Sequence, residues 1–580
     1  MKLRTLLLTA TALTGFAHIA AAGDLSFTAV AAPTEDAIKR SVVATASAMM
    51  DGVEVPLAYH VIARSGDVHG EGTFAQMIDR DGKPLMAGDA TKISNSADFT
   101  SLLPVGGKLF SITHFEDNPA GMYLSELAQD ADGNLSMTST KPLSFAGLGG
   151  LWLPCAGSVS PWNTHLGSEE YPDDARAFEA AATVDALSDD AIGMAPYFGL
   201  DAASMTVDAF KAAYNPYNYG FVNEISVAES GDATIVKHYA MGRVAVELPW
   251  VMPDQKTVYI TDDGSNTGLF MFHADTAGDL TEGNLYAAKW VQTSDVNGGA
   301  ANLEWVDLGH ADQASVQAGM EKGVSFSDMF EVAEFNADGS CPEGFASSNA
   351  GGAAECLKIK AGMEMLASRL ETRRVASMMG ATTEFRKMEG LAFSPEKNAL
   401  FLAMSEVSKG MMDADEKADK GGRNDVRVPK NACGVVYELA LDAAFKATTM
   451  TGLIAGKPME YGADSPYAGG TCDIDGIANP DNLSFIPGYN TLLIGEDTGS
   501  GHQNDAVWAM DLAKGDLVRI MTTPYGSEAT SVDWYSNVNG HAYLMTVVQH
   551  PYGESDQDKL QDPMDARAYV GYLGPFPAVK

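Results

Sequence analysis

Short apolar segments that end in acidic residues recur along the chain. They lie at residues 108–116 followed by 121–126, 258–263 followed by 268–272, 399–406 followed by 434–439, and 491–497 followed by 506–511, with a further strand at 542–550. Each couplet joins a run typical of a buried β-strand to turn residues and a second apolar run. Repeated short strands of this kind favour a β-propeller or a related all-β assembly over alternating strands and helices.

Two segments interrupt the β pattern. Residues 173–213 are rich in Ala, Asp and Phe with little β-branching, and residues 353–379 carry Leu, Ile and Met at helical spacing. Both patterns predict helices. We therefore expect one domain over residues 23–580, an all-β propeller with helical insertions near 173–213 and 353–379, whose apolar residues serve core packing or a lid.

Acidic residues end several of the predicted strands: Glu116, Asp262, Asp263, Glu406, Glu496 and Asp497. In a propeller, equivalent strand ends converge on the central axis, so these carboxylates are expected to meet there. Two carboxylates about 4 Å apart repel by roughly 4 kcal/mol at an effective dielectric constant of about 20. Such a group must bind protons or cations, and oxygen ligands suit Ca²⁺. Taken singly, each acid could equally be a turn residue.

A turn-rich segment places one sulfur and two carboxylates close together in sequence. Cys155 lies among Gly, Ser and Pro residues, and Glu169 and Glu170 follow it. Thiolate favours transition metals whereas carboxylate favours harder cations, so this segment indicates iron or zinc beside calcium-like ions. A buried free cysteine with two solvated acids is the alternative.

The same segment resembles the signature of the PhoX family of secreted alkaline phosphatases. The residues that keep the family spacing are Cys155, Gly157, Pro161, Trp162, Thr164, Leu166, Glu169 and Glu170, and those that depart from it are Ser158, Asn163 and His165. The resemblance implies a six-bladed β-propeller that carries Fe³⁺ and Ca²⁺ at its axial end. It also implies hydrolysis of phosphomonoesters. Because His165 interrupts the signature, we expect it to contact substrate.

Three further segments resemble the family. Residues 241–247 are similar to its Gly-Arg-Phe-x-x-Glu element, residues 387–392 to its later Glu-Gly strand start, and residues 480–482 to an element that precedes a strand. By position, Glu170, Glu247 and Glu389 would join Cys155 around the irons as the catalytic centre. Asn482 would be a calcium ligand, together with the strand-end acids.

Charge bears on the partners of the protein. The 77 acidic and 38 basic residues give a formal net charge of −39, which disfavours nucleic acid and anionic membranes as partners. Such a protein repels phosphate unless bound cations reverse the local field. We expect a monomer that acts on small phosphomonoesters.

The N-terminus has the features of a secretory signal peptide over residues 1–22. Lys2 and Arg4 precede an apolar run that is too short to span a bilayer, and Ala20 to Ala22 precede the expected cleavage site. No later stretch predicts a membrane span, so a periplasmic or extracellular location is expected.

The five cysteines fit an exported protein. Cys341 could pair with Cys356 and Cys433 with Cys472, which would leave Cys155 over, although other pairings remain open. Two rival functions also remain open. One is a calcium-dependent propeller hydrolase, phytase-like or lactonase-like, that needs neither iron nor Cys155. The other is a non-catalytic binding propeller.

Overall fold

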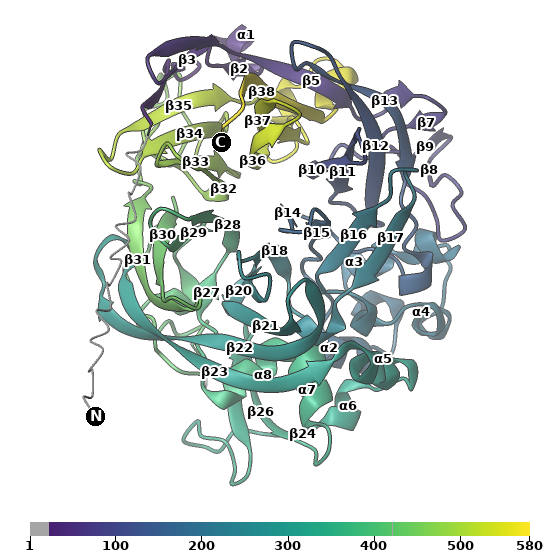
Figure 1. Ribbon diagram of the computed structural model, residues 1–580. Helices are drawn as coiled ribbons and strands as arrows, with labels where there is room; N and C mark the ends of the chain where they lie inside the picture. Colours follow the sequence, from purple (N-terminus) through teal and green to yellow (C-terminus); the bar gives the residue numbers. More distant parts are fainter. Residues whose placement is uncertain (1–22, 420–421, 580) are drawn as a thin grey trace, which may run out of the picture.

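Five large antiparallel sheets surround a common centre in the computed structural model, which describes residues 23–419 and 422–579 (Figure 1). The predicted signal peptide, residues 1–22, lies outside the described residues. The first sheet is β10 (Ala97–Val105), β11 (Lys108–Phe115), β12 (Gly121–Gln129) and β13 (Leu135–Pro142). The second is β14 (Ser158–Val159), β15 (His165–Gly167), β16 (Asn223–Val227) and β17 (Ala233–Lys237).

The third sheet has nine strands. In spatial order they are β18 (Val246–Val251), β19 (Thr257–Asp262), β21 (Phe270–Thr276), β22 (Asp279–Ser294), β23 (Ala300–Asp312), β31 (Ala447–Ala455), β30 (Val435–Leu441), β29 (Ala399–Met404) and β28 (Met388–Ser394). Its two halves are joined where β23 pairs with β31 through residues 300–302 and 449–451.

Segments from the two ends of the chain share the last two sheets. The fourth is β2 (Val43–Ala44), β35 (Leu517–Thr522), β34 (Ala506–Asp511), β33 (Thr491–Glu496) and β32 (Pro480–Ile486). The fifth is β36 (Glu528–Val538), β37 (His541–Gln549), β38 (Tyr569–Pro577) and β5 (Ala58–Arg64). Because β5 pairs with β38, the N-terminal segment completes a C-terminal sheet and holds the ring together (Figure 1).

Three small sheets accompany the five large ones. They are β1 (Leu25–Phe27), β3 (Ser47–Met50) and β4 (Val53–Pro56); β24 (Phe330–Ala333), β26 (Ala353–Ile359) and β25 (Ala346–Ala350); and the pair β20 (Ser265–Thr267) and β27 (Phe385–Arg386). Two further hairpins are β6 (Val68–His69) with β7 (Gly72–Thr73), and β8 (Met86–Ala87) with β9 (Ala90–Thr91).

Strands in the middle of the third and fourth sheets are buried on both faces. Every residue of β19, β29 and β33 is buried. One apolar cluster joins Phe401 of the third sheet to Phe485 and Trp508 of the fourth, so each sheet packs against its neighbours around the ring. This explains why these strands read as continuous apolar runs rather than as alternating patterns. The predicted strands and the all-β class are confirmed.

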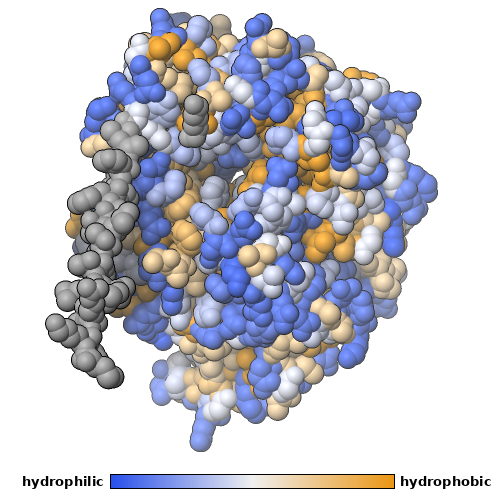
Figure 2. All heavy atoms as spheres, in the orientation of Figure 1, coloured by the Kyte–Doolittle hydropathy of each residue, from blue (hydrophilic) through white to orange (hydrophobic). Residues whose placement is uncertain are grey.

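Edge strands line the centre of the ring, and the nine-stranded sheet contributes both of its edges, β18 and β28. Strand β18 contacts β28, β28 contacts β32, β32 contacts β36, and β36 contacts β10. These strands carry the residues that face the common centre. Figure 2 shows that this side of the molecule is covered mainly by hydrophilic residues and is hollowed near the centre.

Helices gather on one side of the ring (Figure 1). They are α2 (Ala175–Ala180), α3 (Asp189–Gly193), α4 (Val207–Ala213), α5 (Gln313–Glu321), α6 (Phe326–Met329), α7 (Glu364–Leu370) and α8 (Thr372–Met379), with α1 (Asp36–Lys39) elsewhere. The predicted insertion at 173–213 is helical in short pieces. The prediction for 353–379 was wrong at its start, because residues 353–359 form β26. The turn at Gly351 and Gly352, both with positive φ, closes a hairpin that pairs β26 with β25.

The predicted cysteine pairs are both present. Cys341 is bonded to Cys356 and Cys433 to Cys472, and Cys155 is the free cysteine of the described part of the chain. No helix among the described residues combines the length and apolar character needed to cross a membrane.

Candidate metal centre

An acidic residue occupies the second position of four inner edge strands. Asp98 lies in β10, Glu247 in β18, Glu389 in β28 and Asp481 in β32, and Glu528 opens β36. In each of the first four strands, the residue that precedes the acid is paired with the neighbouring strand, and the pairing register shifts at the acid itself. A β-bulge re-aims the side chains beside it. The bulges thus account for acids that leave the strand register and gather at the centre.

A glycine brings two of these strands close together. A Cβ atom at Gly390 would lie 2.6 Å from the Asp481 carbonyl oxygen and 2.9 Å from the Leu483 nitrogen. Only glycine fits such an approach. Gly390 therefore lets β28 and β32 sit side by side, with Glu389 beside Asp481.

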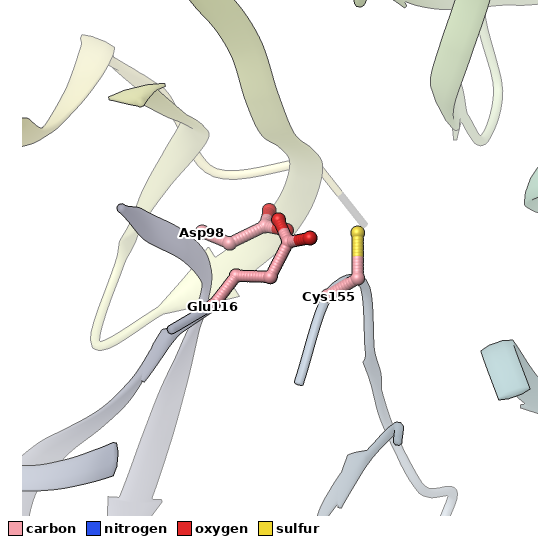
Figure 3. A group of neighbouring side chains, drawn as sticks. All are labelled: Asp98, Glu116 and Cys155. Carbon is pink, nitrogen blue, oxygen red and sulfur yellow. The ribbon is translucent and has the colours of Figure 1, made fainter. Parts of the chain in front are cut away.

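Three overlapping groups of ligand atoms form the centre. They are Asp98, Glu116 and Cys155; Cys155, Glu170 and Glu247; and Glu247, Glu389 and Asp481. Within each group the ligand atoms lie within 4.8 Å of one another. Figure 3 shows the Asp98 and Glu116 carboxylates side by side, with the Cys155 sulfur directed into the same space. Cys155 and Glu247 each belong to two groups, and the Cys155 Sγ lies 3.5 Å from Glu247 Oε1.

Burial and mutual repulsion raise the pKa of each of these acids. Burial raises the pKa of Glu116 to about 8, that of Glu389 to about 7 and that of Asp98 to about 6. The neighbouring charge of Asp98 adds to the effect on Glu116, and that of Asp263 to the effect on Glu389. The same two causes hold the pKa values of Glu170, Glu247, Asp481 and Glu528 well above their usual range.

Several oxygens at the centre lack a protein partner. Both carboxylate oxygens of Asp98, one each of Glu247, Asp263 and Asp481, are buried without a hydrogen bond from the described residues. A buried charge without a partner is costly. The burial of the Cys155 thiol beside Asp98, Glu247 and Glu170 likewise raises its pKa well above the usual range. Cations bound among these atoms would relieve both costs, so the donor set fits metal ions.

Two side chains that the sequence did not single out adjoin the acids. The Lys387 Nζ lies 3.5 Å from Asp263 Oδ2 and 3.6 Å from Glu389 Oε1, and the Tyr171 hydroxyl donates to Asp263 Oδ2. Lys387 is partly exposed, at 26% of its side-chain surface. It therefore brings a positive charge to the edge of a strongly acidic centre.

A fourth group of candidate metal-ligating side chains, Glu528, His550 and Glu554, lies at the edge of the fifth sheet. The His550 Nε2 lies 2.9 Å from Glu528 Oε1 and 3.6 Å from Glu554 Oε1. Asp497 connects this group to the centre, since its charge raises the pKa values of Asp98, Asp481 and Glu528.

The residues predicted from the sequence divide into two sets. Cys155, Glu170, Glu247, Glu389, Asp263 and Asp497 lie in or beside the centre, as does Glu116. Asn482 lies next to it: its Nδ2 donates to Asp481 Oδ2 at 2.6 Å and its Oδ1 accepts from the Ser531 nitrogen at 2.6 Å.

The structure does not bring Glu169, Asp262, Glu406 and Glu496 into the centre, because other protein groups hold them. Glu169 pairs with buried Lys237 at 2.7 Å, and Asp262 with Arg373. Glu406 pairs with Arg386 at 2.9 Å, and Glu496 with His502 at 2.9 Å. These pairs satisfy the carboxylates without a metal ion.

His165 is fully buried and belongs to a directed chain of hydrogen bonds. The Cys155 carbonyl can only accept, so His114 Nδ1 donates to it, at 2.6 Å. Neutral His114 then accepts at Nε2 from His165 Nε2, at 2.7 Å, and His165 Nδ1 accepts from Ser101 Oγ, at 2.9 Å. Burial lowers the pKa of His114 to about 4 and that of His165 well below its usual range, so both rings stay neutral. His165 thus holds the backbone of Cys155 through His114.

Replacing His165 with leucine should cost about 1–3 kcal/mol of unfolding free energy, because His114 Nε2 would be left buried without a donor. KM should stay within about a factor of two, since the ring does not reach the surface. Urea unfolding and steady-state kinetics check both. Ser101→Ala is the control, because it leaves His165 Nδ1 without a donor but keeps the bond from His165 to His114; it should cost a similar amount and also leave KM unchanged. A KM raised tenfold with unchanged stability would restore His165 as a substrate contact.

The profile of a family described as alkaline phosphatase PhoX matches residues 120–551. The chain belongs to the PhoX family of alkaline phosphatases. It is therefore a metal-dependent phosphatase of the phosphoric monoester hydrolase class, and the predicted family is confirmed. The matched residues include Cys155, Glu170, Glu247, Glu389 and Asp481, whereas Asp98 and Glu116 precede them.

A solved structure of Pseudomonas fluorescens PhoX in complex with vanadate, a transition state analogue, matches 95% of this chain and 98% of its own, with a TM-score of 0.60 and 17% identity. This likeness shows the fold, a β-propeller. The periplasmic gluconolactonase PpgL of Pseudomonas aeruginosa is 11% identical over 81% of this chain and 97% of its own, with a TM-score of 0.30. No curated protein matches the chain.

Proposed function

We propose that the protein hydrolyses phosphomonoesters at a cluster of Fe³⁺ and Ca²⁺ ions held at the centre of the ring. The observation that carries this proposal is the set of buried carboxylate oxygens without protein partners around the Cys155 thiol. Family membership supports the reaction, and the donor types support the metals.

The donors divide by their chemistry. Cys155 offers the soft sulfur that selects a transition metal. Glu170 and Glu247 share a group with it, and Glu389 shares the next group with Glu247, so we assign these four to iron. Asp98, Glu116, Asp263, Asp481, Asn482 and Asp497 offer only oxygen and suit calcium. Cys155 and Glu247 are shared between groups, which favours one continuous cluster over separate ions.

The bound cations would supply positive charge to the phosphate oxygens and would activate the attacking oxygen as Lewis acids. The Lys387 ammonium, which lies close to the Asp263 and Glu389 carboxylates, adds a positive charge where the substrate dianion approaches. The Tyr171 hydroxyl holds Asp263 in place. The directed His165 to His114 chain fixes the Cys155 backbone, so the thiol stays at its position as substrates enter and leave.

The architecture around the site extends the proposal. The halves of the nine-stranded sheet, β18 to β23 and β28 to β31, each begin with an inner strand that carries an acid, so we count them as two blades and the ring as six. Residues 23–580 then form one propeller domain that acts as a monomer. Residues 1–22 serve as a signal peptide for export to the periplasm or beyond. The two disulfides support an oxidising compartment.

Metal analysis of protein purified without chelator, combined with assay on p-nitrophenyl phosphate, tests the proposal. Iron and calcium should both be present, and the chelator EDTA should abolish activity that calcium and iron together restore. Calcium without iron, with activity intact, would favour the calcium-dependent hydrolase. Metal-loaded protein without hydrolysis would favour a binding propeller.

A further inference from the structure

A cavity lies beside the metal centre and shares its chain segments. Its volume is about 250 Å³, and its lining includes Tyr171, Arg243, Ala353, Arg373 and Arg374. Tyr171 directly follows Glu170, and Arg243 precedes Glu247 by four residues. The Tyr171 hydroxyl reaches Asp263. The Tyr171 side chain thus lines the cavity and also contacts an acid of the centre.

Arg243 is a buried cation without a carboxylate partner. It is 7% exposed, and no carboxylate oxygen of the described residues lies within 4.0 Å of its guanidinium. Its Nε donates to the Tyr219 carbonyl at 2.9 Å and its Nη2 to the Asp173 carbonyl at 2.6 Å. The third nitrogen, Nη1, has no partner within the described part of the chain. A buried guanidinium normally pairs with an anion.

The other two arginines differ in how far they are satisfied. Arg374 is saturated, because it donates to Asp174, Glu355 and Glu371. Arg373 binds Asp262 and the Asp263 carbonyl through Nε and Nη2. Its Nη1 lies 3.8 Å from where a Cβ at Gly351 would stand, so this nitrogen faces the hairpin that borders the cavity. Arg243 and Arg373 thus each have one guanidinium nitrogen, Nη1, whose N–H groups are available to bind a ligand.

The acids of the lining do not supply that ligand. Asp174 and Glu371 are paired with Arg374. The Asp173 carboxylate accepts from the Ser188 and Tyr214 hydroxyls. The lining carries three arginines and three carboxylates, so its formal charge is zero in a protein whose net charge is −39. The unpartnered Nη1 groups of Arg243 and Arg373, and not an excess of positive charge, favour an anion.

We propose that this cavity binds a second anionic group, carboxylate or phosphate, on the leaving group of the phosphomonoester substrate. The inference rests on the proposed function, since it places the scissile phosphate on the neighbouring centre. A carboxylate or phosphate oxygen pair matches the planar N–H groups of arginine. At about 30 Å³ per water molecule, the volume leaves room for such a group and the carbons that carry it.

Matched substrates test the inference with unaltered enzyme. The pairs are 3-phosphoglycerate against glycerol 3-phosphate, for a carboxylate, and fructose 1,6-bisphosphate against fructose 6-phosphate, for a phosphate. Wild type should hydrolyse at least one anionic member with a kcat/KM about tenfold higher than its partner, mainly through KM, as expected for charge-assisted hydrogen bonds. Equal kcat/KM values within both pairs would overturn the inference.

Ala353 offers a variant that removes no hydrogen bond. Ala353→Glu would place a carboxylate in the cavity, and Ala353→Gln is its neutral control of the same size. Ala353→Glu should abolish the preference for the anionic substrate of each pair and leave glycerol 3-phosphate hydrolysis unchanged. Ala353→Gln should retain that preference. An equal loss for both substrates in both variants would also overturn the inference.

Failure of the proposed function looks different, because no phosphomonoester would then be hydrolysed by metal-loaded protein. In that case calorimetric titration with the same two pairs decides the inference. Tighter binding of an anionic member to wild type than to Ala353→Glu supports an anion site, and equal binding rejects it.

Discussion

Replacing Cys155 with serine should remove bound iron and lower kcat/KM for p-nitrophenyl phosphate by about 10³-fold or more. The thiol is the one soft donor beside the six carboxylates of the three overlapping groups. A serine hydroxyl neither selects a transition metal nor carries a charge at neutral pH. Without the iron, the remaining carboxylates repel one another. Loss of the iron should therefore also weaken the binding of the other metal ions of the cluster. Metal analysis and steady-state kinetics on the same preparation check both effects.

Ser160→Ala is the matched control. Ser160 lies in the turn that follows β14, shortly after Cys155 in the chain. Its hydroxyl contacts Thr164 Oγ1 at 2.7 Å, away from the acids of the centre. This variant should keep iron and activity, which would separate loss of the sulfur from a general disturbance of the loop. Full iron content and activity in Cys155→Ser would contradict the assignment of the sulfur to iron.

Strand positions could be predicted from the sequence because they depend on local hydrophobic runs. Residues 399–404 are apolar throughout, residues 492–495 carry no polar side chain, and the strands that contain them, β29 and β33, are fully buried. The role of the acids at their ends depends on a distant partner. Glu406, Glu496 and Asp497 all end such runs. Only Asp497 lies beside the centre, because Arg386 binds Glu406 and His502 binds Glu496. Nothing near Glu406 in sequence distinguishes it from a metal ligand, because Arg386 lies 20 residues away on β27.

The acids of the inner strands, of which the sequence predicted Glu247 and Glu389 but not Asp98 and Asp481, follow a common rule. Asp98, Glu247, Glu389 and Asp481 each follow a small or apolar residue at the start of an apolar segment. That repeat is visible only once the strand starts are aligned. The bulge that turns each acid inward is a feature of pairing between strands and leaves no local mark, apart from Gly390 beside Glu389. The family resemblance located Glu247 and Glu389 by motif, and it could not locate Asp98, which lies outside the quoted segments.

Removing the metal ions should make the stability of the protein fall as pH rises from about 5.5 to 9. In the folded chain without cations, the pKa values of Asp98, Glu389 and Glu116 stand at about 6, 7 and 8, above their unfolded values. The folded state therefore binds more protons than the unfolded state in this range, and that stabilisation is lost as pH passes each folded pKa. One pKa unit corresponds to about 1.4 kcal/mol, so the three groups together should lower the melting temperature by about 3–6 °C.

Bound calcium should suppress this fall, because the cation replaces the protons as the partner of the carboxylates. Melting temperatures of EDTA-treated and calcium-loaded protein at pH 5.5, 7 and 9 check the difference. The net charge of −39 adds self-repulsion to both forms. The gap that reports on the centre is therefore the difference in melting temperature between the calcium-loaded and the EDTA-treated protein. Glu116→Gln should narrow that gap, since the substitution removes a group whose protonation holds the metal-free centre together. A gap independent of pH would mean that these carboxylates do not face one another in the metal-free protein, and the proposed cluster would lose its electrostatic basis.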